Sequence, residues 1–271
     1  MKNNAISQIA THIRNIDKDR FFVSLFAPKK HHHDLMVLYA FHHELVKIPF
    51  AVNESMAGKI RFQWWWDVVH KRADNASSHP LGPDLMNIVD GMDVSLFETL
   101  IEGREIDLED KPFQTTDDLN RYLDKTNTCL MQMAAQLCDE GNDEDVLRVW
   151  GRAFGIVVLL RNISYDAARG KVLLPYALFP HDHTAVSPHS EALKMAVQTL
   201  CDDALEMLKA NKKKAKKVKT HVSLFGDLAW LYLKEIKRRD YNVFDARLLK
   251  KRPFMAEFKI AFKALTKRRF K

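Results

Sequence analysis

Apolar residues recur every three to four positions along most of this chain, a spacing that predicts helices. The stripe over residues 34–48 ends at Pro49, where a helix must stop because proline lacks the backbone N–H. Asn53, Thr116 and Ser187 are the expected N-caps of later helices. Further helices are expected over residues 53–70, 116–137, 143–165, 188–210, 221–239 and 245–268, with loops at 74–83 and 173–188.

The same spacing predicts which helix faces are buried. In the helix over 53–70, the expected inward face consists of Met56, Ile60, Trp64 and Val68. The helix over 143–165 is apolar enough to be central in the fold. Its longest uninterrupted apolar run, residues 153–160, is too short to span a bilayer.

Composition supports a helical protein with one domain. Only 9 of the 271 residues are glycine and 9 are proline, which favours long helices over many short strands. No G-x-G-x-x-G or G-x-x-x-x-G-K-S/T sequence occurs, which disfavours Rossmann and P-loop enzymes. The three cysteines form no C-x-x-C pair, so the sequence predicts a reducing compartment and no disulfide framework or zinc ribbon.

Charge is distributed unevenly along the chain. The net charge is +7, yet residues 212–271 alone carry 20 Lys and Arg against 5 Asp and Glu. A basic segment on an acidic body suggests an anionic partner. The alternative is that these lysines form a solvated helix face, and we favour this alternative for most of them. The lysine run at 212–217 has no interleaved aromatic residues, so nucleic-acid binding is the weakest hypothesis.

Two local clusters carry competing interpretations. Histidines at 31–33, followed by His42 and His43, could ligate a metal, but the 31–33 triplet lacks an H-E-x-x-H arrangement. A solvated helix start is the favoured interpretation. Trp64, Trp65 and Trp66 point in three directions on a helix, so core packing is favoured over a base-stacking platform.

Three segments together resemble the squalene/phytoene synthase family. They are Tyr39-Ala40-Phe41, the run Arg61-Phe62-Gln63-Trp64-Trp65, and residues 160–175, which read LRNISYDAARGKVLLP. The resemblance covers residues 18–245, followed by a basic C-terminal helix at 246–271. It implies the all-α isoprenoid synthase fold, a single helical domain around an apolar cavity. The residues expected to line that cavity are Tyr39, Phe41, Leu45 and Val158.

The family's chemistry uses two aspartate motifs that hold Mg²⁺ ions on a diphosphate, since hard cations take oxygen ligands. This chain departs from both motifs. The acidic positions of the first are Val46, Lys47 and Phe50, and those of the second are Asn162 and Asp166. We therefore expect no catalytic residue, no metal site and no cofactor. The retained basic residues Arg161, Arg169 and Lys171 are candidates for binding an anion, with helix-end salt bridges as the alternative.

Within the family, the chain most resembles a non-catalytic branch that assists the assembly of respiratory complex I. This resemblance is carried by Ala40-Phe41-x-x-Glu44-Leu45, by Gly155-Ile156-Val157-x-x-Leu160-Arg161-x-x-x-Tyr165 and by Phe22-x-Ser24-Leu25-x-x-Pro28. It implies complex I subunits or assembly intermediates as partners, an isoprenoid or other lipid as a ligand, and peripheral attachment to an anionic membrane.

The expected location is the cytoplasm or the inner membrane, on the matrix side if the source is eukaryotic. Asp17 and Asp19 near the start of the chain favour a bacterial form without a transit peptide. The alternative function is an active Mg²⁺-dependent head-to-head prenyltransferase of the squalene/phytoene synthase type.

Overall fold

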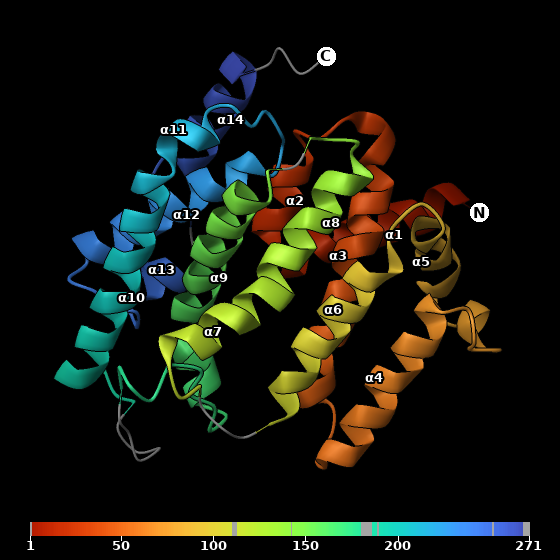
Figure 1. Cartoon of the computed structure of the whole chain (residues 1–271), viewed down its shortest axis with the longest axis horizontal. Coiled ribbons are helices and arrows are strands. Elements are labelled where there is room, and N and C mark those ends of the chain that lie inside the picture. Colours follow the sequence, from red (N-terminus) through yellow and green to blue (C-terminus); the bar gives the residue numbers. More distant parts are fainter. Residues whose placement is uncertain are drawn as a thin grey trace. The chain divides into compact units, whose positions relative to one another are not determined.

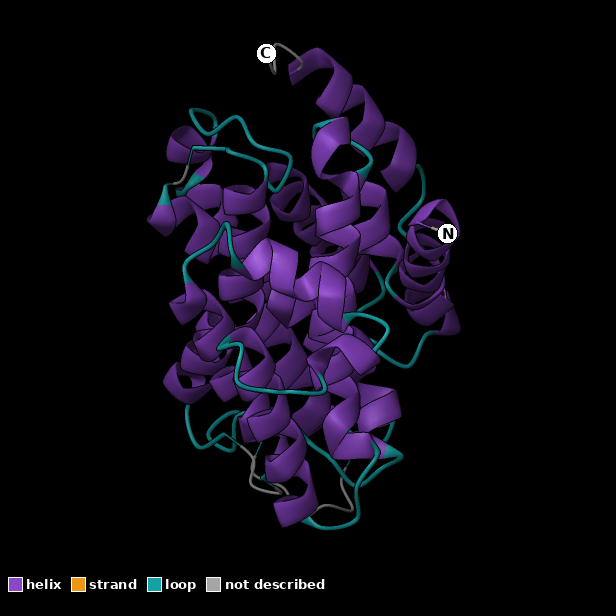
Figure 2. Cartoon of the chain, turned by 90° about the vertical axis from the view of Figure 1, so that its right-hand side faces the viewer, coloured by secondary structure: helices purple, strands orange, loops and turns teal. Residues whose placement is uncertain are grey.

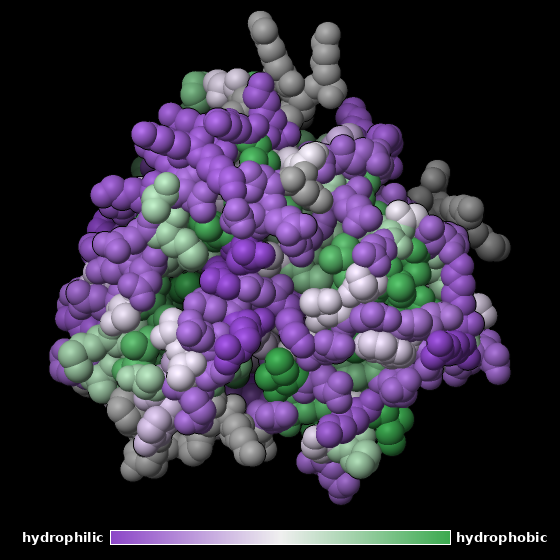
Figure 3. Space-filling model, in the orientation of Figure 1, coloured by the Kyte–Doolittle hydropathy of each residue, from purple (hydrophilic) through white to green (hydrophobic). Residues whose placement is uncertain are grey.

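The computed structural model describes residues 2–109, 113–141, 143–179, 186–188, 190–250 and 252–267. Within these ranges every regular element is a helix, as Figure 2 shows. The all-α prediction is therefore confirmed for the described part of the chain. On the face shown in Figure 3, hydrophilic residues predominate at the surface and hydrophobic residues appear between them.

The helices, which are labelled in Figure 1, group into two compact units. Unit 1 comprises residues 1–109, 129–142 and 220–222, and unit 2 comprises residues 110–128, 143–219 and 223–271. The α-helices of unit 1 are α1 (Lys2–Ile16), α2 (Lys18–Ser24), α3 (His32–Lys47), α4 (Ser55–Val69), α5 (Gly82–Val89), α6 (Val94–Glu105) and α8 (Cys129–Leu137). Those of unit 2 are α7 (Thr116–Leu123), α9 (Glu144–Ala167), α10 (Glu191–Ala210), α11 (Lys212–Ala215), α12 (Ser223–Arg238), α13 (Ala246–Lys250) and α14 (Ala256–Lys267).

Short 3₁₀-helical and π-helical turns connect several of these elements. The 3₁₀ turns are η1 (Lys29–His31), η2 (Ile48–Phe50), η3 (Ala76–Ser78) and η4 (Ile106–Leu108). A π-helical segment, η5 (Asp124–Thr128), follows α7 directly and precedes α8, so the helix predicted over 116–137 contains a π-bulge. Pro49 lies within η2, and α3 ends before it as predicted.

Unit 1 is built around α3, which packs against α1, α5, α6 and α8. Nine consecutive or near-consecutive α3 residues, from Leu35 to Leu45, are buried, so α3 is enclosed on more than one side. Helix α4 packs on α6 and α5 beside it, and these helices are seen in orange and yellow in Figure 1.

The predicted inward face of α4 is wrong at two positions. Met56 and Ile60 are exposed, and the buried side of the helix is formed by Gly58, Phe62 and Trp65. The physical reason is a close approach of η4: a Cβ built on Gly58 would lie only 2.3 Å from Leu108 Cδ2. The glycine lets the leucine side chain reach the helix backbone, which sets the rotation of α4.

Of the three tryptophans, Trp65 is buried and the other two are half-buried, and the Trp64 and Trp65 rings contact each other with 4.7 Å between centroids. Trp65 is buried, with its ring centroid 5.3 Å from that of Phe41. Trp64 is half-buried and its indole N–H donates to Asn75 Oδ1 at 2.9 Å. Trp66 stacks on His70, with 5.1 Å between ring centroids.

Unit 2 is built around α9, which contacts α12, α10, α7 and η5. Twelve of its residues are buried, which confirms the predicted central helix within this unit. Two glycines allow these close contacts. A Cβ on Gly151 would lie 2.5 Å from the Cα of Thr128, and a Cβ on Gly226 would lie 2.3 Å from Trp150 Cδ1.

Several predicted boundaries were wrong. The N-caps are Glu54, Thr115 and Ser190 in place of Asn53, Thr116 and Ser187. Thr115 belongs to a capping box with Asp118, and the Ser190 hydroxyl accepts from the backbone N–H of Leu193. At two of these starts a side-chain hydroxyl reaches a free backbone N–H, whereas Glu54 makes no side-chain capping bond, and several polar residues near each start could have served.

The stretch expected to be one basic C-terminal helix contains two, α13 and α14. Pro253 lies between them and cannot continue a helix. Met255, just before α14, has a positive φ of 57°, which turns the chain sharply at that point. Residues 251 and 268–271 of the predicted helix lie outside the described residues.

Many charges of the basic C-terminal quarter are paired inside unit 2. Lys214 contacts Asp143 and Asp145 at 3.1 and 2.7 Å. Arg239 bridges Glu235 and Asp245 at 2.6 and 2.5 Å. The Lys214 side chain is 45% exposed, in agreement with a solvated face, whereas the Arg239 side chain is 12% exposed and largely enclosed with its partners. Among the described residues, no helix is both long and apolar enough to cross a membrane.

Candidate functional site

The first motif region lies at the end of α3 in unit 1. Lys47 is exposed and its ammonium donates to Glu44 Oε1 at 2.7 Å. Val46 is half-buried, and Phe50, in η2, is 46% exposed. These three residues stand where the first motif of the family has acidic residues. They present an alkyl group, a cation and an aromatic ring, and none of them offers an anionic oxygen.

The three residues on α3 that were expected to line a cavity are all buried. Leu45 and Phe41 are fully buried, and the Phe41 ring contacts those of Trp65 and Phe97 at 5.3 and 5.9 Å between centroids. The Tyr39 side chain is buried, and burial raises the pKa of its hydroxyl well above the usual range. Phe41 thus packs among α3, α4 and α6. The cavity-lining role of Tyr39, Phe41 and Leu45 stays a prediction.

A buried polar contact that sequence reasoning missed lies beside this stretch. Arg104 on α6 donates from Nη2 to His42 Nε2 at 2.9 Å, and its Nη1 contacts Asp107 at 3.1 Å. His42 and Arg104 are 7% and 8% exposed. Burial first, and then the Arg104 guanidinium, lowers the pKa of His42 well below its ordinary value. The sequence feature that could have revealed this contact is the position of Arg104, three residues after Ile101 on the buried stripe of α6.

Acid is expected to destabilise the protein through His42. Because its pKa in the folded chain lies far below 6.5, the unfolded chain binds more protons below pH 6.5, and stability falls as the pH drops. At pH 5.5 the loss from this histidine is about 1 kcal/mol relative to pH 8. Urea unfolding at both pH values would measure it.

The matched control for this measurement is His42→Gln, which keeps an acceptor for Arg104 and does not titrate. His43, whose pKa is also lowered by burial, is retained in both proteins, so its contribution cancels. An identical pH dependence in the wild type and His42→Gln would contradict the assignment to His42.

The second motif region lies on α9 in unit 2. Val158, Asn162 and Asp166 follow one another at four-residue intervals, so they share one face of this helix. Val158 and Asp166 are half-buried, and Asn162 is exposed. Among these three side chains, Asp166 is the one that carries a carboxylate.

Arg161 on α9 is held inside unit 2. Its Nε donates to the Leu248 carbonyl on α13 at 3.1 Å. Its guanidinium lies 4.4 Å from the ring centroid of Tyr232 on α12, a cation–π distance. Arg161 therefore links three helices, which is a structural role beside the anion-binding role expected from the sequence.

The end of α9 places the other two basic residues in a turn. The backbone N–H groups of Arg169 and Lys171 both donate to the Asp166 carbonyl at 2.9 Å, and Gly170 takes the positive φ of 73° that closes the helix. The Arg169 guanidinium lies 3.5 Å from the centroid of the Tyr165 ring. Lys171 is half-buried. Anion binding by Arg161, Arg169 and Lys171 stays a prediction.

The histidines at 31–33 lie at the start of α3 in unit 1. His31 Nε2 is 3.4 Å from Asp139, and His33 Nε2 is 3.4 Å from Asp84. Over the residues the structure describes, no group of three or more His, Cys, Asp or Glu side chains is arranged to hold a metal ion.

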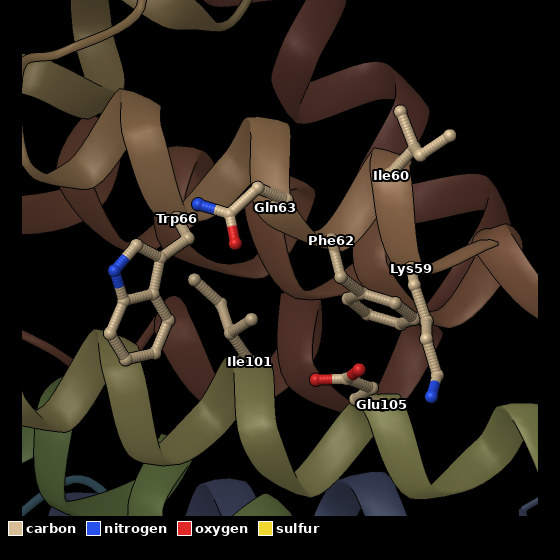
Figure 4. Close-up of a pocket in the computed structure, with 7 residues that line it drawn as sticks. All are labelled: Lys59, Ile60, Phe62, Gln63, Trp66, Ile101 and Glu105. Atoms are coloured by element: carbon tan, nitrogen blue, oxygen red, sulfur yellow. The ribbon is translucent and has the colours of Figure 1, made fainter. Parts of the chain in front are cut away.

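Unit 1 also contains a surface cavity that the sequence did not suggest. Its volume is about 340 Å³, and it lies between α4 and α6. Figure 4 shows Trp66, Gln63 and Phe62 projecting from α4 toward Ile101 and Glu105 on α6, with Lys59 and Ile60 at one end. The cavity depends on which face α4 turns outward, and that rotation was mispredicted.

The arrangement of helices matches a known class of protein. A crystal structure of a dehydrosqualene synthase in complex with a ligand superposes with a TM-score of 0.79, covering 97% of this chain and 96% of that one at 15% identity. The fold is thus the all-α isoprenoid synthase fold, as predicted. A sequence model of the squalene/phytoene synthase family matches residues 13–254, and the chain belongs to that family.

The curated relatives include proteins that are described as assembly factors and not as synthases. The chain is 27% identical to human NADH dehydrogenase (ubiquinone) complex I, assembly factor 6, over 169 residues, which is 60% of this chain and 50% of that protein. It is 24% identical to the bovine assembly factor 6 over 253 residues, 88% of this chain and 76% of that protein. The matched stretch thus spans half of the human protein.

Proposed function

We propose that this chain is a non-catalytic accessory factor in the assembly of respiratory complex I. Its similarity to assembly factor 6 from two mammals supports the proposal. The observation that carries the non-catalytic part is Lys47, a cation paired with Glu44 at a position where the family's first motif has a carboxylate.

The donor set does not fit a Mg²⁺–diphosphate site. Mg²⁺ takes oxygen ligands and depends on clustered carboxylates, because each one offsets part of the cost of removing the ion's water. Val46 and Lys47 at the end of α3 and Phe50 in η2 supply no such ligand. On α9, Asn162 supplies an amide and Asp166 the remaining carboxylate. We therefore derive no catalytic step through a metal for this chain.

A chain without that site can still bind apolar partners, because burying apolar surface needs no metal. The proposal accordingly assigns complex I subunits or assembly intermediates as partners and allows an isoprenoid or another lipid as a ligand. It places the protein beside the membrane that holds the complex, on the cytoplasmic side in a bacterium or the matrix side in a mitochondrion.

Deleting the gene is expected to remove most assembled complex I from native gels of the source organism, while the other respiratory complexes change little. The reason is that an assembly factor limits one complex only. Re-expression of the wild-type chain is the control. Normal complex I in the deletion strain would contradict the proposal.

The second candidate is a Mg²⁺-dependent prenyltransferase, favoured by family membership and by the retained Arg161 and Asp166. We expect the purified chain to form no presqualene diphosphate, squalene or phytoene from farnesyl or geranylgeranyl diphosphate with Mg²⁺. A dehydrosqualene synthase assayed in parallel is the positive control. Product formation above the no-enzyme background would favour this candidate over the first.

A further inference from the structure

Helix α14 carries a row of exposed apolar side chains. Phe258, Phe262 and Leu265 are 63%, 60% and 58% exposed, and their spacing of four and three residues places them on one face. The Phe258 and Phe262 rings are stacked, with 6.3 Å between centroids. Phe254, just before the helix, is 86% exposed. Isolated exposed apolar residues are ordinary, but a continuous aromatic row on one helix face indicates a binding surface.

The opposite face of α14 fixes the direction of this row. Ala256, Ile260 and Ala264 are buried, and α14 packs against α12. Lys263 forms an ion pair with Asp227 on α12. These contacts hold the helix on unit 2 by its buried face, so the aromatic row must point away from α12.

Cationic groups border the row. Lys259 is exposed directly beside Phe258, and Lys263 follows one turn later. The single acidic residue of the helix, Glu257, is paired with Arg252 at 2.8 Å. Aromatic and leucine side chains on one face with lysines at its edge are the composition of helices that lie in a membrane interface. The exposed Lys259 matches the negative potential of anionic lipids, which argues for a bilayer over an uncharged protein groove.

We propose that α14 binds the surface of an anionic bilayer, with Phe258, Phe262 and Leu265 entering the boundary between head groups and acyl chains. Lys259 then meets the anionic head groups. This assigns membrane contact to one face of one helix, whereas charge along the chain implicated the whole basic segment. The inference stands independently of the role in complex I assembly.

The first test is co-sedimentation of the full chain with vesicles of phosphatidylcholine, with and without about 30% phosphatidylglycerol, at low and high salt. The double substitution Phe258→Ser and Phe262→Ser is expected to weaken binding to the anionic vesicles about tenfold or more. Lys259→Glu is expected to weaken it less and to reduce the salt dependence.

The matched control is the double substitution Met56→Ser and Ile60→Ser on α4, since these side chains are 66% and 64% exposed. It removes a similar apolar surface from unit 1 and is expected to leave vesicle binding unchanged. An equal loss in both double variants would overturn the proposal. So would the absence of binding by the wild type to either vesicle, which would leave the α14 face to a protein partner.

A second test reports on insertion itself. The three native cysteines are buried, and burial raises the pKa of the Cys129, Cys138 and Cys201 thiols to about 12, so they react slowly. A polarity-sensitive maleimide dye should therefore label Phe262→Cys selectively. Anionic vesicles are expected to shift its emission to shorter wavelength and raise its intensity. Sedimentation with vesicles without any spectral change would show attachment elsewhere and overturn the proposal.

Discussion

Replacing Phe41 with alanine is expected to destabilise the protein by about 3–5 kcal/mol, the usual cost of removing a buried aromatic ring. Phe41 is fully buried and its ring touches those of Trp65 and Phe97, so the void could close only if three helices shifted. Urea denaturation followed by circular dichroism would measure the loss.

Phe50→Ala is the matched control, because Phe50 lies nine residues later and is 46% exposed. Its expected cost is about 1 kcal/mol or less, since much of its surface already contacts water. A small effect at Phe41, comparable to that at Phe50, would show that the Phe41 ring lines an open space, as the family resemblance implied, and that it is not required for packing.

Replacing Gly151 with leucine is expected to cost about 3 kcal/mol or more, at or beyond the upper end of the usual range for overpacked sites. A Cβ at this position would lie 2.5 Å from the Cα of Thr128, and a backbone atom cannot move aside as a flexible side chain can. The expected result is a protein in which α9 and η5 no longer pack. Thermal unfolding and expression in soluble form would both report it.

Gly141→Leu is the control for this substitution. Nothing lies within 4 Å of a Cβ built on Gly141, which is exposed in the loop after α8. The leucine there is expected to change stability by about 0.5 kcal/mol or less. If both variants were equally stable, the close approach of α9 to η5 would not be a constraint on this fold.

The rotation of α4 and the break before α14 were both mispredicted, each for its own physical reason. Helix periodicity reports where apolar residues recur, but it does not report what a helix packs against. The rotation of α4 was mispredicted because Gly58 lets Leu108 approach the backbone, and that contact joins residues fifty positions apart. The break before α14 falls at Pro253, which cannot continue a helix, although apolar residues recur on both sides of it.

The sequence by itself determined that the chain is helical, where most long helices lie, and which family it belongs to. These follow from local spacing and from short motifs, which need no knowledge of distant contacts. It also showed that Val46, Lys47, Phe50 and Asn162 cannot act as carboxylates, because side-chain chemistry does not depend on the fold.

Tertiary structure alone decided the pairing of His42 with Arg104, the engagement of Arg161 by Leu248 and Tyr232, and the outward direction of the aromatic row on α14. Each of these depends on which helix lies beside which. On α14, Phe258 and Ile260 are equally apolar in sequence, and only contact with α12 separates the buried residue from the exposed one. Burial is a property of the packed neighbours, so a pattern along one helix cannot fix it.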